Sequence, residues 1–475
     1  MKRILVILAM LIAINANAQW ASYTLPYIGI ASTLGFYDLN HGVSFGHTIN
    51  SATEKIFYTS NSGVTWNAAT YPQELRAIVE MQYINANTIY ACGSENTPFS
   101  NFGRTNDDFK LYPKFIRDRI TRESIKVSNN VSKGAFIKST DGGLNWQRGS
   151  QFDTSAGIIR DINFFDANTG YALIQANSYM QSKFYKTTNA GSNWQLVKQF
   201  DTAYVDKMIF FDMNTGIAKG ISWQKKIYKT TNAGVNWSVT NMSSMISDIT
   251  FFNSTTGIAI GSSGETYINY IYKTTNAGDN WNVVNTFQGN KSYNTIMSLP
   301  NTGTAFAVGN NIDTAIQWID KITTLKTTNY GLNWVSKDFN PKLLAYGLSL
   351  VDANNFFISA GEINLAAQIL KSTNGGNVFV NQIGASVPSS YSLGQNYPNP
   401  FNPSTVVRFQ LSVFCDVSLK VYDVKGREVQ TLVNERLRAG TYEAKFDGSG
   451  LNSGVYYYKL VAGDISETKK MLLLK

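Results

Sequence analysis

Short runs of apolar and aromatic residues, each interrupted by a turn of Asn, Asp or Gly, recur along most of the chain. The clearest run covers residues 162–172 and reads Ile-Asn-Phe-Phe-Asp-Ala-Asn-Thr-Gly-Tyr-Ala. Similar runs occupy residues 34–44, 81–91, 209–218, 249–259, 297–307 and 348–359. Short apolar runs of this length predict strands, and the Asn, Asp and Gly residues between them predict tight turns. Each run is therefore predicted to form a strand, a turn and a second strand.

A second repeated stretch follows each of these runs. Residues 185–194 read Tyr-Lys-Thr-Thr-Asn-Ala-Gly-Ser-Asn-Trp, and residues 228–237 and 272–281 are nearly identical. Variants at residues 57–66, 137–146, 325–334 and 370–379 bring the number of copies to seven. The Thr-rich start favours a strand, Asn can bond to the backbone two residues on, and Gly accepts a positive φ. The stretch therefore predicts a hairpin corner, after which Trp, or Phe379 in the last copy, begins a fourth strand.

Seven units of four strands predict an all-β fold, a seven-bladed β-propeller over residues 19–385. Residues 19–26 and residues 378–384 both read as outer strands, but only one of them is needed to complete seven blades. The N-terminal strand either closes the ring on the last blade or extends beyond it.

The best-preserved second stretch, residues 139–146, reads Ser-Thr-Asp-Gly-Gly-Leu-Asn-Trp. It resembles the Asp-box, or BNR, repeat, with Asn in place of Asp in most other copies. Its pairing with a Phe-Phe-Asp strand resembles the propellers of photosystem II assembly-factor-like proteins and sortilin-type domains. The resemblance implies a fold and leaves the ligand open.

The N-terminus has the pattern of a secretory signal peptide over residues 1–18: two basic residues, an apolar core and a small-residue cleavage site. Charged residues make up only 15% of the chain, which suits an extracellular all-β protein. The two cysteines, Cys92 and Cys415, fall in different predicted domains, so we expect two buried thiols and no disulfide.

The net charge of +9 is unevenly distributed. An insertion at residues 97–133 carries eight basic and four acidic residues, and the rest of the propeller is neutral. This distribution does not favour nucleic-acid binding. Within the insertion, residues 113–120 fit either a short basic helix or a solvated loop.

The last part of the chain has a different composition. Residues 386–392 read as a linker, and the short strands predicted in residues 393–475 indicate a small β-sandwich. Residues 396–403 read Asn-Tyr-Pro-Asn-Pro-Phe-Asn-Pro, and this tail closely resembles the type A C-terminal sorting domain of type IX secretion cargo. The residues that carry the resemblance include Tyr397, Pro398, Asn399, Pro400, Phe401, Asn402, Pro403, Gly426, Arg427, Gly440, Gly454, Lys469 and Lys470.

This resemblance implies export through the type IX translocon as the partner of the C-terminal domain. It also implies that the protein is released or attached to the outer-membrane surface, commonly after the sorting domain is removed. We expect a monomer with no transmembrane segment.

Candidate ligand-binding residues recur near the predicted channel mouth. Polar residues stand just before the innermost strands, and aromatic residues stand between the second and third strands. They are Arg76, Arg160, Asp161, Asp206, Lys207 and Asp248, and Trp223, Tyr270 and Trp318. The polar set can equally form a structural ring, and some of the aromatic set can be strand core.

No catalytic set, metal site or cofactor motif is evident. The arginine cluster and Phe/Tyr-Arg-Ile-Pro signature of sialidases are absent, and the only histidines, His41 and His47, are poorly placed for a metal. We therefore expect a non-enzymatic module that binds a protein or glycan. The alternatives are a glycoside hydrolase using two of Asp161, Asp206 and Asp248, and a scaffold without a small ligand.

Overall fold

The computed structural model describes most of the chain. The described residues are 20–48, 54–95, 133–150, 152, 157–176, 181–263, 268–313, 318–339, 343–361, 366–373, 380–384, 388–413, 415–437, 439–448 and 451–475. The predicted signal peptide and all but the last residue of the insertion lie outside them, including residues 113–120, for which the sequence left a helix and a loop open. No helix among the described residues is long and apolar enough to span a membrane.

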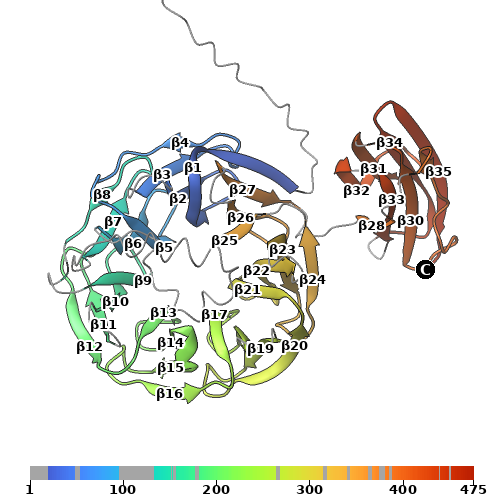
Figure 1. Ribbon diagram of the computed structural model, residues 1–475. Coiled ribbons are helices and arrows are strands. Elements are labelled where there is room, and N and C mark those ends of the chain that lie inside the picture. The colour runs from blue at the N-terminus through green and yellow to red at the C-terminus, as the bar shows by residue number, and fades with distance from the viewer. Residues whose placement is uncertain are drawn as a thin grey trace, which may run out of the picture. The chain divides into compact units, whose positions relative to one another are not determined.

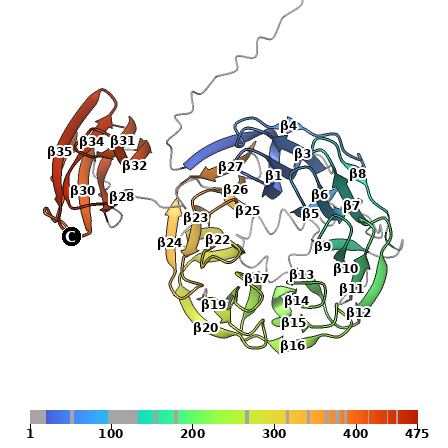
Figure 2. The ribbon, with the colours of Figure 1, turned by 180° about the vertical axis from the view of Figure 1, so that it is seen from behind.

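Two compact units make up the chain, and the larger one, Ser22–Gly375, is a seven-bladed β-propeller. Figures 1 and 2 show its blades from the two sides, arranged in chain order around a ring. The first blade consists of the C-terminal half of β1 (Trp20–Phe36) with β2 (Gly42–Thr48), β3 (Glu54–Thr59) and β4 (Asn67–Ala68), and the second of β5 (Ala77–Tyr83), β6 (Ile89–Ser94), β7 (Gly134–Ser139) and β8 (Gln147–Arg148). The third blade consists of β9 (Ile158–Phe164), β10 (Gly170–Gln175), β11 (Ser182–Thr187) and β12 (Gln195–Phe200). The fourth consists of β13 (Val205–Phe210), β14 (Gly216–Gly220), β15 (Lys226–Thr230) and β16 (Ser238–Asn241).

The remaining blades follow the same order, with the first strand innermost. The fifth blade consists of β17 (Met245–Phe251), β18 (Gly257–Ser262), β19 (Ile268–Thr274) and β20 (Asn282–Gln288). The sixth consists of β21 (Lys291–Ser298), β22 (Ala305–Asp313), β23 (Trp318–Thr327) and β24 (Val335–Phe339). The seventh consists of β25 (Leu344–Leu350), β26 (Phe356–Gly361) and β27 (Ala366–Ser372) with the N-terminal half of β1. The fourth blade also has a short 3-10 helix, η2 (Ser222–Gln224).

The long strand β1 closes the ring, which decides between the two alternatives left open by the sequence. It lies between β27 of the last blade and β2 of the first blade in one continuous sheet. The hydroxyl of Ser22 donates to Oε1 of Gln368 over 2.8 Å, and Leu25 is only 1% exposed. The first strand in the chain therefore completes the last blade.

The competing strand, β28 (Val380–Gly384), belongs to the other unit, where it pairs with β33 (Gly440–Asp447). The expectation that residues 380–384 belong to the propeller is therefore wrong, and residue 385 does not mark its end. Because β1 already covers β27, the last blade offers no free edge to β28.

The repeated corner is a hairpin held by its own side chains. In the third blade, Oδ1 of Asn189 accepts from the hydroxyl of Thr187 and from the amide of Asn193, and the amide of Gly191 donates back to Thr187. The side-chain oxygen of Asn189 therefore bonds to the backbone amide four residues on, whereas the sequence pattern predicted a bond two residues on. Both Ala190 and Gly191 have positive φ, at 58° and 74°, so two successive left-handed residues make the turn.

Two of the Trp residues that end a corner, Trp146 and Trp237, pack against the preceding blade. Trp146 meets Phe45 with ring centroids 5.3 Å apart, and Trp237 meets Phe184 at 5.7 Å, both edge to face. The indole nitrogens of these two residues donate to Gly143 and Gly234 respectively. The Trp-led strand therefore links neighbouring blades through a large buried aromatic surface.

The second unit is a β-sandwich. Its sheets are β28-β33-β30-β29 and β32-β31-β34-β35, built from β29 (Ser392–Leu393), β30 (Ser404–Leu411), β31 (Cys415–Tyr422), β32 (Glu428–Leu437), β34 (Gly454–Ala462) and β35 (Ile465–Leu473) with β28 and β33. Buried positions alternate along β31 and β33, as two facing sheets require. Cys92 and Cys415 are both free and buried, one in each unit, which confirms the expectation of two thiols.

Candidate functional site

Every innermost strand of the propeller carries a β-bulge at the same place, where one extra residue interrupts its pairing with the second strand. The bulged residues are Ser32, Val79, Arg160, Asp206, Ser247, Asn294 and Tyr346. A bulge redirects the side chains next to it. We name the residues that follow the bulges the channel ring: Thr33, Glu80, Asp161, Lys207, Asp248, Thr295 and Gly347. Its four charged members come from four consecutive blades.

A cavity of about 470 Å³ lies against this ring. Its lining comes from β1, β5, β9, β13, β21 and β25, and includes every member of the channel ring except Asp248. Met81 and Met297 contribute apolar surface to the same cavity, and Ser349 contributes a hydroxyl. Its volume lies in the range of small-molecule sites.

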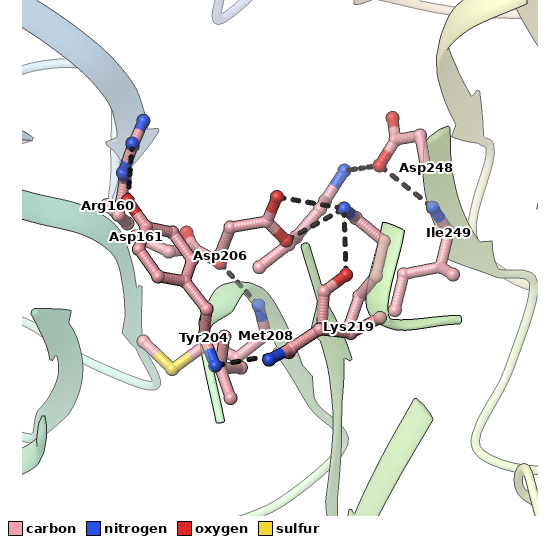
Figure 3. Close-up of polar contacts among 12 residues, drawn as sticks. Arg160, Asp161, Tyr204, Asp206, Met208, Lys219, Asp248 and Ile249 are labelled. Atoms are coloured by element: carbon pink, nitrogen blue, oxygen red, sulfur yellow. Dashed lines mark hydrogen bonds and ion pairs between the residues drawn. The ribbon is translucent and has the colours of Figure 1, made fainter. Parts of the chain in front are cut away.

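Asp161 links two blades. It is 5% exposed, and its Oδ2 accepts from the backbone amide of Met208 in the next blade over 2.6 Å (Figure 3). Asp248 repeats the arrangement, because its Oδ2 accepts from the amide of Ile296 over 2.9 Å. Both carboxylates therefore hold adjacent innermost strands together, which supports the structural-ring interpretation of these two positions.

Lys207 stands among the acids of the ring. Its Nζ lies 2.6 Å from Oδ1 of Asp248. Burial alone would lower the pKa of Lys207, but the carboxylates of Asp248, Glu80 and Asp161 raise it above its ordinary value. The lysine is therefore a fixed positive charge in the channel.

Two acids of the ring have raised pKa values. Burial raises the pKa of Asp161 well above its ordinary value, and the nearby Glu80 raises it further. Burial also raises the pKa of Glu80, although Lys207 opposes this shift. Three carboxyl groups therefore surround one lysine, and two of them, those of Glu80 and Asp161, line the cavity.

Asp206 occupies a bulge and faces a different partner. Its Oδ1 lies 2.7 Å from Nζ of Lys219, which comes from β14 of the same blade and is 3% exposed (Figure 3). Asp206 therefore pairs with a different lysine from the one that pairs with Asp248. The structure therefore gives each predicted acid its own partner: a backbone amide for Asp161, Lys219 for Asp206 and Lys207 for Asp248.

Arg160 is also held in place. Its Nε donates to Oε1 of Gln175 over 2.6 Å, and its Nη2 donates to the hydroxyl of Tyr204 over 3.1 Å. Arg76 immediately precedes β5, and its amide donates to the carbonyl of Ser94. Its buried Nη1 has no hydrogen-bond partner among the described residues.

The predicted aromatic residues do not form one surface. Tyr270 lies within β19, partly buried against the core of its blade, where its ring centroid is 6.1 Å from that of Tyr272. Trp318 begins β23 and Trp223 lies in η2, and the side chains of both are outside the described residues. The expectation that Tyr270 and Trp318 lie in loops is wrong, because both strands begin earlier than the pattern suggested.

The sequence pattern predicted that the polar residues precede the innermost strands, and this prediction was wrong by a few positions for most of them. Arg160, Asp161, Asp206 and Asp248 lie within their strands, and only Arg76 precedes one. Glu80 and Lys219 were not predicted to belong to the site. Glu80 could have been found, because it stands three residues before the aromatic that ends β5, as Asp161 does before Phe164 in β9. Nothing in the repeat marks Lys219.

The sorting-motif residues are spread over the second unit. Phe401 is 2% exposed in its core, whereas Tyr397 is 82% exposed. Gly426 has a φ of 75° in the turn before β32, where Arg427 pairs with Asp423 over 2.7 Å. Phe401, Gly426 and Arg427 therefore each support the fold of the domain.

Comparisons with known proteins found a similarity for each of the two units. Residues 395–474 match the family model of the secretion system C-terminal sorting domain. YCF48 bound to D1 peptide has a TM-score of 0.51 at 14% identity, and the match covers 76% of this chain and 99% of that one. YCF48 from Cyanidioschyzon merolae has a TM-score of 0.50 at 14% identity, covering 75% and 99%. At this identity the similarity shows the propeller fold alone. A comparison with curated proteins found no match.

Proposed function

We propose that this type IX secretion cargo is a non-enzymatic binding module, whose propeller engages a protein segment or a glycan at its central channel. Export follows from the sorting domain at residues 395–474, which marks proteins that are secreted or displayed at the cell surface. The function of the propeller is inferred from its channel.

The observation that carries the proposal is the cavity of about 470 Å³ beside a ring of charged side chains. Its lining combines carboxyl, ammonium and hydroxyl groups with the apolar side chains of Met81 and Met297. A cavity of mixed character suits a sugar ring or the side chain of a peptide, because polar groups fix orientation while apolar surface supplies affinity.

The fixed partners of the acids favour binding over glycoside hydrolysis. A hydrolase needs one carboxyl group that can donate a proton and another that is free to attack or to activate water. Asp206 is ion-paired to Lys219, and Asp248 accepts from both Lys207 and the amide of Ile296. Both carboxylates are therefore already engaged.

The test incubates the purified chain with a panel of polysaccharides and peptides, and scores both retention and release of reducing ends. We expect retention of a ligand without release. Glu80→Gln replaces the carboxyl group at the cavity with an amide of the same shape, so it should weaken retention, whereas Asp279→Asn on the outer rim, 56% exposed, should not.

Release of reducing ends would overturn the proposal in favour of the hydrolase, particularly if Asp161→Asn and Asp206→Asn abolish it. Retention that is unchanged in Glu80→Gln would place the ligand elsewhere on the propeller. No retention of any polymer or peptide would favour a scaffold.

A further inference from the structure

The sorting motif at residues 396–403 closes the free edge of the last strand. The amide of Phe401 donates to the carbonyl of Leu472 in β35, and the amide of Leu474 donates to the carbonyl of Phe401. Oδ1 of Asn399 accepts from the amide of Leu472 over 2.9 Å. Because β35 is at the edge of its sheet, this segment satisfies backbone groups that would otherwise face solvent.

Buried residues anchor the segment at both ends. Asn396 is 2% exposed and donates through Nδ2 to the carbonyl of Pro398 and to the hydroxyl of Thr405. The backbone amide of Asn396 donates to the hydroxyl of Tyr458. Phe401 packs in the core, with its ring centroid 5.7 Å from that of Phe446. These residues of the motif are accounted for by folding.

Tyr397 differs from them. At 82%, it is the most exposed large hydrophobic side chain among the described residues. Its main chain is nevertheless fixed, because its amide donates to the carbonyl of Val406 and its carbonyl accepts from the amide of Val406. Pro398, Asn399 and Pro400, which follow it, are exposed as well. The fold thus holds an aromatic ring in solvent on an ordered backbone.

We propose that Tyr397 is the residue by which the type IX export machinery recognises the folded sorting domain. A tyrosine on a fixed backbone offers large amphipathic area at a low cost in conformational entropy, and such residues dominate protein interfaces. The partner surface is an apolar pocket that accepts the ring, with the neighbouring prolines at its rim. This inference rests on the sorting function of the domain, not on what the propeller binds.

The test expresses the full chain in a bacterium with an active type IX system, and compares the fraction at the cell surface or in the medium with the fraction retained in the periplasm. Tyr397→Ala should lower the exported fraction about tenfold, the effect expected from losing one aromatic anchor. Tyr397→Phe should restore most of it, because the ring is kept. Val424→Ala is the matched control, since Val424 is 66% exposed in another turn of the same domain.

Thermal unfolding of the retained variant separates recognition from folding. We expect Tyr397→Ala to unfold at the wild-type temperature and to keep the ligand retention of the propeller. Wild-type export of Tyr397→Ala would overturn the proposal. So would a lowered unfolding temperature that Tyr397→Phe reverses, or an equal loss of export in Val424→Ala. A change in oligomeric state with normal export would instead assign the ring to contact between copies of this chain.

Discussion

The ammonium of Lys207 lies 2.6 Å from Oδ1 of Asp248, and this contact joins the innermost strands of two neighbouring blades. Asp248 is only 7% exposed at its side chain, and Lys207 is 29% exposed. The same carboxylate accepts from the amide of Ile296 in the blade beyond. One acidic side chain therefore connects three consecutive blades at the channel.

Replacing Lys207 with Met should lower the free energy of unfolding by about 2–3 kcal/mol near neutral pH, because it leaves Asp248 buried without its counter-ion. All nine tryptophans precede the sorting domain, so urea unfolding followed by tryptophan fluorescence reports on the propeller. The matched control is Lys229→Met, whose partner Asp279 is 56% exposed and whose loss should cost less than about 1 kcal/mol. Equal losses would mean that leaving the buried Asp248 without its lysine costs no more than leaving the exposed Asp279 without its own.

The raised pKa of Asp161 predicts a pH dependence of stability. A carboxyl group whose pKa is higher in the folded chain stabilises the fold most below its unfolded pKa, about 3.9 for Asp, and that contribution is lost as the pH rises. Asp161→Asn keeps an oxygen acceptor for the amide of Met208 but cannot ionise. Its stability relative to wild type should therefore increase from pH 4 toward pH 8.

The measurement is urea unfolding of both proteins at several pH values within that interval. A difference that stays constant with pH would show that Asp161 does not change its protonation on unfolding. A difference that falls with rising pH would mean that the folded protein prefers the ionised carboxylate.

Adjacent glycines in one corner should differ in their tolerance of a methyl group. Gly142 and Gly143 both have positive φ, at 76° and 96°. A Cβ at Gly143 would lie 2.5 Å from Cγ2 of Val43 in the neighbouring blade, whereas at Gly142 the nearest atom is the carbonyl oxygen of Ala86 at 3.5 Å. Gly142→Ala should cost about 1 kcal/mol through backbone strain, and Gly143→Ala about 2–3 kcal/mol because the blades must also separate. Equal costs by urea unfolding would contradict the inter-blade contact.

The strand that closes the ring should be as important to stability as any core strand. Leu25 is 1% exposed between the first and last blades, so Leu25→Ala should lower the free energy of unfolding by about 2–4 kcal/mol. Its exposed neighbour Thr24 is the control, and Thr24→Ala should stay within about 0.5 kcal/mol of wild type. If Leu25→Ala is equally neutral, the ring does not depend on β1 for closure.

The repeat could be read from the sequence because each blade buries a similar surface and turns with similar chemistry. The corner residues, such as Thr187, Asn189 and Gly191, bond within a few positions of one another, so local pattern was sufficient to place them. The sorting domain was recognisable for a similar reason, since its motif residues Asn396 and Phe401 serve the fold directly.

The channel residues were only partly predictable. The sequence picked out Asp161 and Asp248 as polar residues in a repeated place, but the β-bulges that turn them decide which partner each one meets. Lys219 was missed because it belongs to a second strand and reaches Asp206 only once the blade is folded. Tyr270 was wrongly placed in a loop, since an aromatic at a strand start does not reveal where pairing begins.

By itself, the sequence determined the number of blades, the chemistry of each corner and the presence of a sorting domain, because these depend on contacts between residues close in the chain. Only the tertiary structure decided that β1 closes the ring, that β28 belongs to the other unit and that Phe401 of the sorting motif is buried whereas Tyr397 is exposed. Those outcomes depend on which edge is already covered when two strands of similar pattern compete for it. The exposure of one side chain likewise depends on packing from residues far away in the chain.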